Sequence, residues 1–377
     1  MAPILPGATI GILGGGQLGR MTTLAARPLG YHVRVLDPES DCAARPVADE
    51  VITADFDDHL AAAELARRSD VVTLEIEKVG LESLRSAALY APVRPGEHVL
   101  AIVQDRARQK EWLGRHGFPV GPWRPAHSAA ALGDAVAALG RSFAKRCTGG
   151  YDGRGQALVA AAGDSEAAWR AIGEAPCVVE QALDLEAELS VMVARRPSGE
   201  MAVYPPALNH HEERILDWSV LPGPIPPDIA ARAEEIARGI AEQIGLEGLL
   251  AAEMFVTRDG ALLVNELAPR PHNTFHSTER ACVTSQFEQH ARAVCDLPLG
   301  STAVLRPAAI INLLGDLWRD GAEPPFDRAL ALPGVGLHLY GKRGARSGRK
   351  MGHLSAIGDT PREAVELVKR AKAELER

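Results

Sequence analysis

The stretch Lys145-Arg-Cys-Thr-Gly-Gly-Tyr-Asp-Gly-Arg-Gly-Gln156 is the most informative part of the chain. It leads from one apolar, strand-like segment to another through a loop with four glycines. Glycines lack Cβ atoms, so backbone N–H groups there can close over an anion, and Lys145 and Arg154 add positive charge. The pattern predicts a flap between two strands that covers a triphosphate; a glycine-rich hairpin turn without a ligand is the alternative. The flap is not a P-loop, because G-x-x-x-x-G-K-[ST] does not occur in the chain.

The composition is that of an ordinary globular protein. With 377 residues, 46% hydrophobic and 24% charged, the chain can bury sizeable cores in two or three domains. No apolar run reaches membrane-spanning length, residues 1–6 lack the layout of a signal peptide, and the net charge is −8. We therefore expect neither a membrane nor a nucleic-acid partner. Five cysteines without C-x-x-C spacing indicate no zinc site and a reducing compartment, so we predict a cytoplasmic protein.

The N-terminal third alternates strands and helices. Residues 9–13 predict a buried strand, residues 14–19 satisfy G-x-G-x-x-G, and a helix and a second strand ending in Asp37 follow. This α/β pattern is typical of a Rossmann-like domain, so an NAD(P)-dependent oxidoreductase is one candidate. Ligands of open α/β sheets gather outside the carboxyl ends of strands, which would place Glu75 and the glycine turn at one pocket. A solvated strand-end carboxylate is the alternative for Glu75.

Two carboxylates define a candidate metal site. Residues 249–257 and 261–267 predict two strands, and a two-residue turn between them would pair Arg258 with Ala261 and place Glu253 opposite Glu266. Facing carboxylates on apolar strands repel and resist desolvation. Mg²⁺, which binds one or two carboxylates together with phosphates, would compensate. A register different by one residue, or lysine and arginine partners elsewhere, are the alternatives.

Two further groups of polar and basic residues follow, one just after the second strand and one in a loop of the C-terminal region. Arg270, His272 and Asn273 follow the second strand, which places them beside the metal. Residues 341–353 hold five cations and four glycines in an acidic protein. Such a loop suits a phosphate monoester, which is bound by charge-assisted donors; a solvated basic hairpin is the alternative.

Four motifs together resemble the N5-carboxyaminoimidazole ribonucleotide synthetase family, over essentially the whole chain: residues 15–20, 148–156, 265–270 and 348–353. The resemblance implies the ATP-grasp fold, of α/β and α+β class. An N-terminal Rossmann-like domain would span residues 1–96, the ATP-grasp domain residues 97–300 with a lid at about 118–180, and a small β-rich C-terminal domain residues 301–377. It also implies a homodimer that carboxylates 5-aminoimidazole ribonucleotide with bicarbonate and ATP in purine biosynthesis, through carboxyphosphate.

The resemblance also implies a set of site residues. ATP would contact Arg106, Lys145, Gly150, Tyr151, Asp152, Gly153, Arg154, Gly155, Gln156, Glu180, Gln181, Ala182, Leu183, Glu188, His211, Asn265 and Glu266. Mg²⁺ would bind Glu253 and Glu266. The aminoimidazole ribonucleotide would lie near Glu75, Tyr151, Asp152 and Arg154, with its phosphate on Lys342 and Arg349. Tyr151, Asp152, Arg154, Arg270, His272 and Asn273 would be catalytic, the last three around bicarbonate.

One position departs from the wider superfamily, and two other functions remain open. Many ATP-grasp enzymes have Glu-x-Asn after the second carboxylate, whereas this chain has Glu266-Leu-Ala268. In a regular hairpin Asn265 points to the opposite strand face, so Asn273 is a candidate third ligand. Another ATP-grasp ligase of purine biosynthesis, such as formate-dependent glycinamide ribonucleotide transformylase, would share the ATP and metal residues. A non-catalytic nucleotide-binding regulator is the other candidate.

Overall fold

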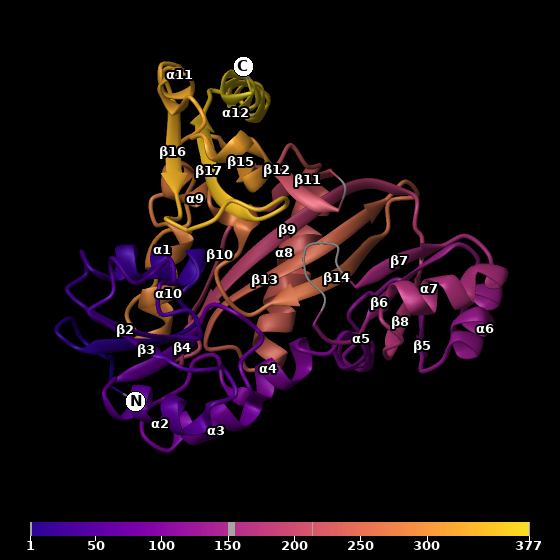
Figure 1. The fold of residues 1–377 in the computed structure, drawn as a ribbon, viewed down its shortest axis with the longest axis horizontal. Coiled ribbons are helices and arrows are strands. Elements are labelled where there is room, and N and C mark those ends of the chain that lie inside the picture. Colours follow the sequence, from indigo (N-terminus) through magenta and orange to yellow (C-terminus); the bar gives the residue numbers. More distant parts are fainter. Residues whose placement is uncertain (1, 150–154, 213, 377) are drawn as a thin grey trace.

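The computed structural model describes residues 2–149, 155–212 and 214–376 (Figure 1). The N-terminal part is a four-stranded parallel sheet in the order β3-β2-β1-β4. Its elements are β1 (Thr9–Leu13), α1 (Gln17–Ala26), β2 (His32–Asp37), β3 (Glu50–Thr53), α2 (His59–Arg67), β4 (Val71–Leu74) and α3 (Leu81–Ala88). Strands β1 and β4 are apolar and almost completely buried, as expected for parallel strands covered on both faces. The predicted strand, glycine turn, helix and strand are confirmed.

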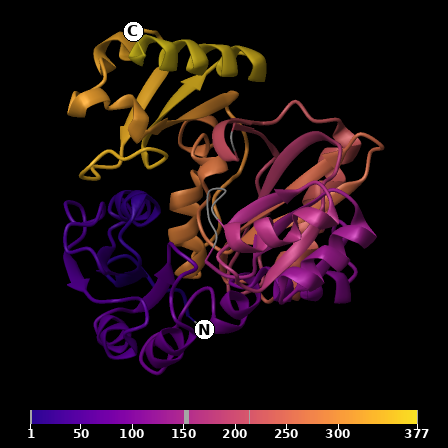
Figure 2. The ribbon, with the colours of Figure 1, turned by 45° about the vertical axis from the view of Figure 1, so that its right-hand side comes forward.

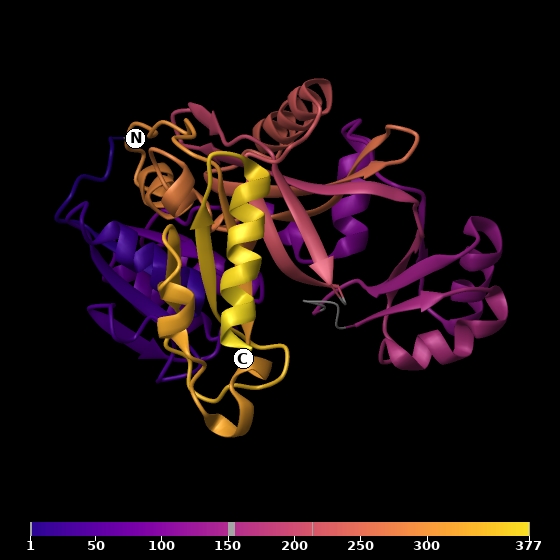
Figure 3. The ribbon, with the colours of Figure 1, turned by 90° about the horizontal axis from the view of Figure 1, so that it is seen from above.

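The lid projects to the right in Figure 1 and away from the rest in Figure 3. It is a four-stranded antiparallel sheet in the order β5-β8-β6-β7, reached through α4 (Glu97–Val103) and α5 (Arg106–Arg115). Its elements are β5 (Trp123–Ala126), α6 (Ala129–Leu139), β6 (Ser142–Arg146), β7 (Gln156–Val159), α7 (Ser165–Ala171) and β8 (Cys177–Gln181). Lys145 pairs with Gln156 across β6 and β7, so the glycine-rich segment does connect two strands. Residues 150–154 of that segment lie outside the described residues.

The largest sheet extends from the centre of the molecule into the C-terminal part. Its order is β14-β13-β9-β11-β12-β15-β17-β16, with β10 paired to β9. The strands are β9 (Leu185–Arg195), β10 (Met201–Val203), β11 (Ala207–Glu212), β12 (Ile215–Leu221), β13 (Gly248–Thr257), β14 (Leu262–Ala268), β15 (Ala308–Leu314), β16 (Val335–Leu339) and β17 (Lys350–Ile357). The C-terminal strands join through β12 and β15, where Trp218 pairs with Ile311. One sheet therefore links two of the predicted domains; their boundaries at 96/97 and 300/301 stay a prediction.

Helices cover both ends of this sheet. They are α8 (Pro227–Gln243), α9 (Thr278–Ala281), α10 (Gln286–Val294), α11 (Phe326–Leu330) and α12 (Pro361–Leu375). Ile229, Ala233 and Ile240 of α8 recur at helical spacing and are buried in the same core as β9 and β13. Figure 2 shows the N-terminal part, in indigo, below the C-terminal part, in yellow, with the central sheet beside both. No helix of the described chain is long and apolar enough to span a membrane.

The β13–β14 hairpin differs from its prediction in two ways that cancel. Thr257, not Arg258, pairs with Ala261, because Gly260 adopts a φ of +84° and closes a turn over residues 258–260. Further along, Met254 pairs with Val264 but Glu253 with Glu266, which leaves Asn265 as an extra residue on β14. The predicted Arg258–Ala261 pair is therefore wrong. The facing Glu253–Glu266 pair is confirmed, because the extra residue restores the register.

Candidate active site

One cavity of about 1140 Å³ lies between the lid, the large sheet and the N-terminal sheet. All three parts of the chain line it: Gln17 and Glu75 from the first, Lys145 from the lid, and Lys342 from the C-terminal loop. Its volume exceeds that of a pocket for one small ligand. The predicted nucleotide site and the predicted phosphate-monoester site therefore open into the same space.

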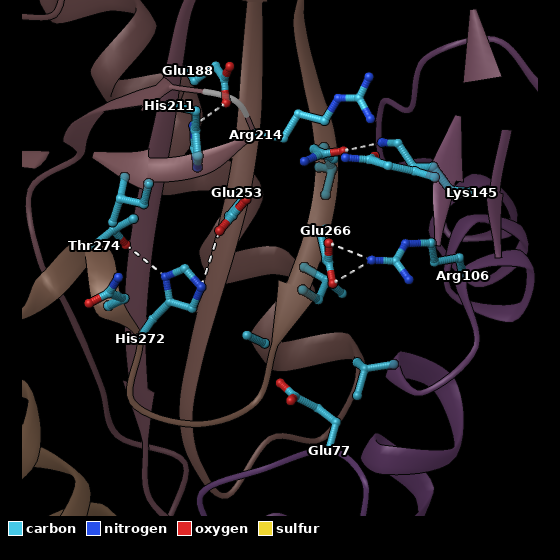
Figure 4. Close-up of a pocket in the computed structure, with 18 of the residues that line it drawn as sticks. Glu77, Arg106, Lys145, Glu188, His211, Arg214, Glu253, Glu266, His272 and Thr274 are labelled. Carbon is cyan, nitrogen blue, oxygen red and sulfur yellow. Dashed lines mark hydrogen bonds and ion pairs between the residues drawn. The ribbon is translucent and has the colours of Figure 1, made fainter. Parts of the chain in front are cut away.

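The facing carboxylates lie in this cavity (Figure 4). Burial, and then the nearby charge of Glu266, raise the pKa of Glu253 to about 7. His272 Nε2 lies 3.2 Å from Glu253 Oε1, and Arg106 Nη2 lies 3.3 Å from Glu266 Oε2. Arg106 is thus an arginine partner of Glu266, which was one of the alternatives considered for the sequence. Ionisation of the buried Glu253 carboxyl group stays unfavourable, and a bound cation would remove that cost. Two carboxylate groups in this position fit Mg²⁺.

Asn265 faces the cavity together with Glu266. Its Oδ1 lies 3.5 Å from Lys145 Nζ. The expectation that it points to the opposite face holds only for a regular hairpin and is wrong here, because the irregularity in β14 turns both side chains to one side.

A cluster of opposite charges lies under the lid strands. Glu180 on β8 places Oε2 3.0 Å from Lys145 Nζ and Oε1 3.3 Å from Lys110 Nζ. Lys110 lines the cavity but is absent from the residues predicted for it. The signal was available in the sequence, because Lys110 follows Arg106 by four residues on one helix and so shares its face.

Glu188 and His211 meet on neighbouring strands of the large sheet (Figure 4). The Glu188 Oε2 atom lies 2.8 Å from His211 Nδ1. Burial acts to lower the pKa of His211, but the hydrogen bond and charge of Glu188 outweigh it and raise the pKa above its ordinary value. The two side chains are thereby held together at the cavity wall.

The connector after β8 contributes only some of its predicted residues to the wall. Gln181 and Leu183 line the cavity, whereas the Ala182 N–H donates to the Arg141 carbonyl at 2.8 Å. On the flap, Gln156 lines the cavity and Gly155 accepts a hydrogen bond from the Arg146 N–H. Gly150, Tyr151, Asp152, Gly153 and Arg154 lie outside the described residues.

Glu75 closes the glycine turn. Its carboxylate accepts hydrogen bonds from the Gly16 N–H at 2.6 Å and the Gly19 N–H at 2.7 Å, at the start of α1. A Cβ atom on Gly16 would lie 2.5 Å from Glu75 Oε1, so the glycine is needed for this approach. In a dinucleotide-binding domain a pyrophosphate takes these N–H groups. A carboxylate already holds them here, which argues against an NAD(P) enzyme, and Glu75 is buried rather than solvated.

The basic C-terminal loop reaches the glycine turn from above. Lys342 Nζ donates to Gln17 Oε1 and to the Lys350 carbonyl. Both lysines line the cavity, although Lys350 was not predicted. Arg349 is not among the lining residues: its Nη1 donates to the Arg343 and Gly344 carbonyls, and its Nη2 lies 4.0 Å from Glu39 Oε2. The predicted phosphate contact of Arg349 stays a prediction.

Arg270, His272 and Asn273, in the segment that follows β14, line the wall beside the carboxylates. Arg270 Nε lies 2.7 Å from Glu77 Oε1. Burial, and then the charge of Arg270, hold the pKa of His272 well below its ordinary value, so its imidazole is neutral. The Asn273 side chain is buried, and neither of its polar atoms has a hydrogen-bond partner among the described residues. A buried amide without partners is costly, which leaves a donor and an acceptor for a ligand.

Comparison with known proteins decides the family. An N5-carboxyaminoimidazole ribonucleotide synthase of Bacillus subtilis is 41% identical over 353 residues, which cover 93% of this chain and 92% of the relative. Another, from Brucella melitensis, is 43% identical over 355 residues, covering 93% of this chain and 97% of the relative. The chain belongs to the N5-carboxyaminoimidazole ribonucleotide synthase family.

Family models and solved structures agree with this membership. A model described as the ribonucleotide synthetase preATP-grasp domain matches residues 7–104, the ATP-grasp domain matches 111–287, and the phosphoribosylaminoimidazole carboxylase C-terminal domain matches 308–367. The crystal structure of the ADP complex of one synthetase has a TM-score of 0.93 at 41% identity, with both chains fully covered. The Aspergillus clavatus synthase with ADP and 5-aminoimidazole ribonucleotide has a TM-score of 0.89 at 31% identity, covering 98% of this chain and 99% of that one. The predicted family and the predicted ATP-grasp fold class are confirmed.

Proposed function

We propose that this chain carboxylates 5-aminoimidazole ribonucleotide with bicarbonate, at the expense of ATP, in purine biosynthesis. The observation that carries the proposal is the single cavity that joins the Glu253–Glu266 pair to the basic C-terminal loop. A ligase must hold its nucleotide and its phosphorylated acceptor within reach of each other. The family to which the chain belongs supports the same chemistry.

ATP would occupy the part of the cavity between the lid and the large sheet. Lys145 and Arg106 would bind its phosphates, the Glu188–His211 pair its ribose, and the connector at Gln181 and Leu183 its base. Bound Mg²⁺ on Glu253 and Glu266 would neutralise charge on the transferring phosphoryl group. Asn265 lies beside Lys145 and Glu266 and would complete the polar wall.

The acceptor would occupy the N-terminal side of the cavity. Lys342 and Arg349 would bind its phosphate, while Glu75 and the flap residues Tyr151, Asp152 and Arg154 would surround its imidazole. Bicarbonate would lie against Arg270, His272 and Asn273, next to the metal carboxylates. The unpartnered amide of Asn273 supports this placement, because a small oxyanion offers several acceptors.

The chemistry has two steps. Bicarbonate is a poor electrophile, so ATP would phosphorylate it to carboxyphosphate with Lys145 beside the transferred group. The exocyclic amine of the acceptor would then attack carboxyphosphate, or CO₂ released from it, and Asp152 would orient the amine or take its proton. A closed flap would exclude water, which otherwise hydrolyses the intermediate.

We further propose a homodimer in the cytoplasm. The homodimer is an expectation from the family resemblance. The cytoplasm is expected from the cysteine usage, because all five cysteines are unpaired and buried, which suits a reducing compartment.

The test of the acyl donor is ADP release in the presence of Mg·ATP and aminoimidazole ribonucleotide. We expect release to depend on bicarbonate and not to be supported by formate. Release with formate and glycinamide ribonucleotide, and none with bicarbonate, would assign the chain to the transformylase alternative.

A further inference from the structure

Lys110 is a buried cation at the base of the nucleotide side of the cavity. It lies on α5, one turn after Arg106, and only 4% of its side chain is exposed. Burial lowers the pKa of its ammonium group, and the charge of Glu180 at 3.3 Å acts in the opposite direction. A buried ammonium group is tolerated only with such a counter-ion.

The counter-ion is shared. The second oxygen of Glu180 lies 3.0 Å from Lys145 Nζ, and 12% of the Glu180 side chain is exposed. Although burial acts to raise it, the charges of Lys145 and Lys110 hold the pKa of Glu180 below its ordinary value. Two cations share this one carboxylate, and Lys145 is the one whose Nζ also lies 3.5 Å from Asn265 Oδ1, next to Glu266 in the chain.

This arrangement matters when a nucleotide arrives. To bind a phosphate, the Lys145 ammonium group must weaken or give up its ion pair with Glu180. If Lys145 were the only cation on Glu180, that move would leave a buried carboxylate without a partner, which is strongly unfavourable. Lys110 holds the carboxylate in place and keeps Lys145 available.

We propose that Lys110 is a positioning residue for ATP binding, which acts through Glu180 by releasing Lys145 to the nucleotide phosphates. The inference rests on the proposed role of Lys145 in binding ATP. The two lysines that contact Glu180 thus have different roles. Lys145 binds the phosphates, and Lys110 stabilises the Glu180 carboxylate when Lys145 leaves it.

The first test is the substitution Lys110→Met. We expect the KM for ATP to rise about tenfold or more, which corresponds to the loss of about 1.4 kcal/mol, while the KM for aminoimidazole ribonucleotide and kcat change little. Lys110→Arg keeps the charge and should retain most ATP affinity. The matched control is Arg108→Met, an exposed cation on the same helix, which should leave both KM values unchanged. An unchanged KM for ATP in Lys110→Met would overturn the proposal.

The decisive test adds Glu180→Gln to Lys110→Met. Glu180→Gln keeps the backbone of the connector and the size of the side chain, and removes only the charge. Without the carboxylate, Lys145 has no partner to leave, so the double variant should bind ATP more tightly than Lys110→Met alone. If Lys110 contacts the nucleotide directly or only supports packing, the second substitution will not restore affinity, and the proposal fails. If Lys110→Met does not fold, the ATP affinity of the double variant is compared with that of Lys145→Ala instead. An affinity as poor as that of Lys145→Ala would contradict the proposal.

A separate variant keeps this inference apart from the function on which it rests. Normal ATP affinity in Lys145→Ala would contradict the proposed ATP site itself. Weakened affinity in Lys145→Ala together with no recovery in the double variant would contradict the role of Lys110 alone.

Discussion

At the scale of single residues, the site is built from charges that the protein cannot satisfy alone. Glu253 faces Glu266 across two strands, and burial raises its pKa to about 7. Glu75 shows the opposite solution, since two backbone N–H groups satisfy its carboxylate inside the glycine turn. Glu253 therefore carries a cost of ionisation that a cation would remove, while Glu75 organises the glycine turn.

The first prediction concerns the metal pair. Glu253→Gln and Glu266→Gln should each fold, because each removes one of two repelling charges. Each should lose most turnover at limiting Mg²⁺, since one carboxylate ligand of the metal is gone. Steady-state turnover against Mg²⁺ concentration is the measurement, with the thermal midpoint as the folding control. Near-normal turnover at limiting Mg²⁺ in either variant would count against the metal assignment.

The second prediction separates the two anion sites. Lys342→Ala and Arg349→Ala should raise the KM for the ribonucleotide and spare the KM for ATP, whereas Lys145→Ala should weaken ATP binding. Each lost charged contact should cost about 1.5–3 kcal/mol, or roughly 10- to 150-fold. The division is wrong if the C-terminal variants lose ATP affinity and keep a normal ribonucleotide KM.

At the scale of elements, the sequence predicts what local chemistry decides. Alternating strands and helices, the glycine turn and the α8 stripe are all present as predicted, because each follows from periodicity or from a glycine. The extra residue at Asn265 and the turn over 258–260 were not predictable, since both depend on how β14 meets β13. The spacing from Arg106 was enough to place Lys110 at the cavity, but not to find its partner Glu180, which is 70 residues away and reaches it only in the folded chain.

The third prediction tests the turn that sets the hairpin. Gly260 has a φ of +84°, and a Cβ atom there would meet nothing within 4 Å. Gly260→Ala should therefore destabilise the fold by about 1 kcal/mol through backbone strain alone. Chemical denaturation measures the loss, and both KM values should stay unchanged. A large change in the KM for ATP would mean that the turn controls the register of the carboxylates.

At the scale of the whole molecule, stacked imidazoles join the central and C-terminal parts. His276 stacks on His353 with ring centroids 4.8 Å apart, and His353 stacks on His338 at 5.2 Å. Burial, and then the charge of His338, lower the pKa of His353 to about 3. The neutral ring is thus part of the packing between sequence segments that lie far apart.

The fourth prediction follows from that pKa. In the unfolded chain the His353 imidazole takes up a proton below about pH 6.5, whereas in the folded protein it does so only near pH 3. The contribution of His353 to the free energy of unfolding is therefore fully present above pH 6.5 and decreases as the pH falls below that value. Between pH 7 and pH 5 the advantage of the native protein over His353→Gln should shrink by about 2 kcal/mol. Thermal midpoints at both pH values measure it, with the exposed His127→Gln as control. A constant difference would show that His353 titrates normally.

The proposed reaction transfers a carboxyl group from bicarbonate to the aminoimidazole amine within this one cavity. The most direct measurement incubates the protein with Mg·ATP, aminoimidazole ribonucleotide and labelled bicarbonate, and follows the label. We predict label on the nucleotide in an amount that matches the ADP formed, stable in base and lost in acid, because an N-carboxylate releases CO₂ when protonated. ADP formation with no label on the nucleotide, or label that survives acid, would contradict the account.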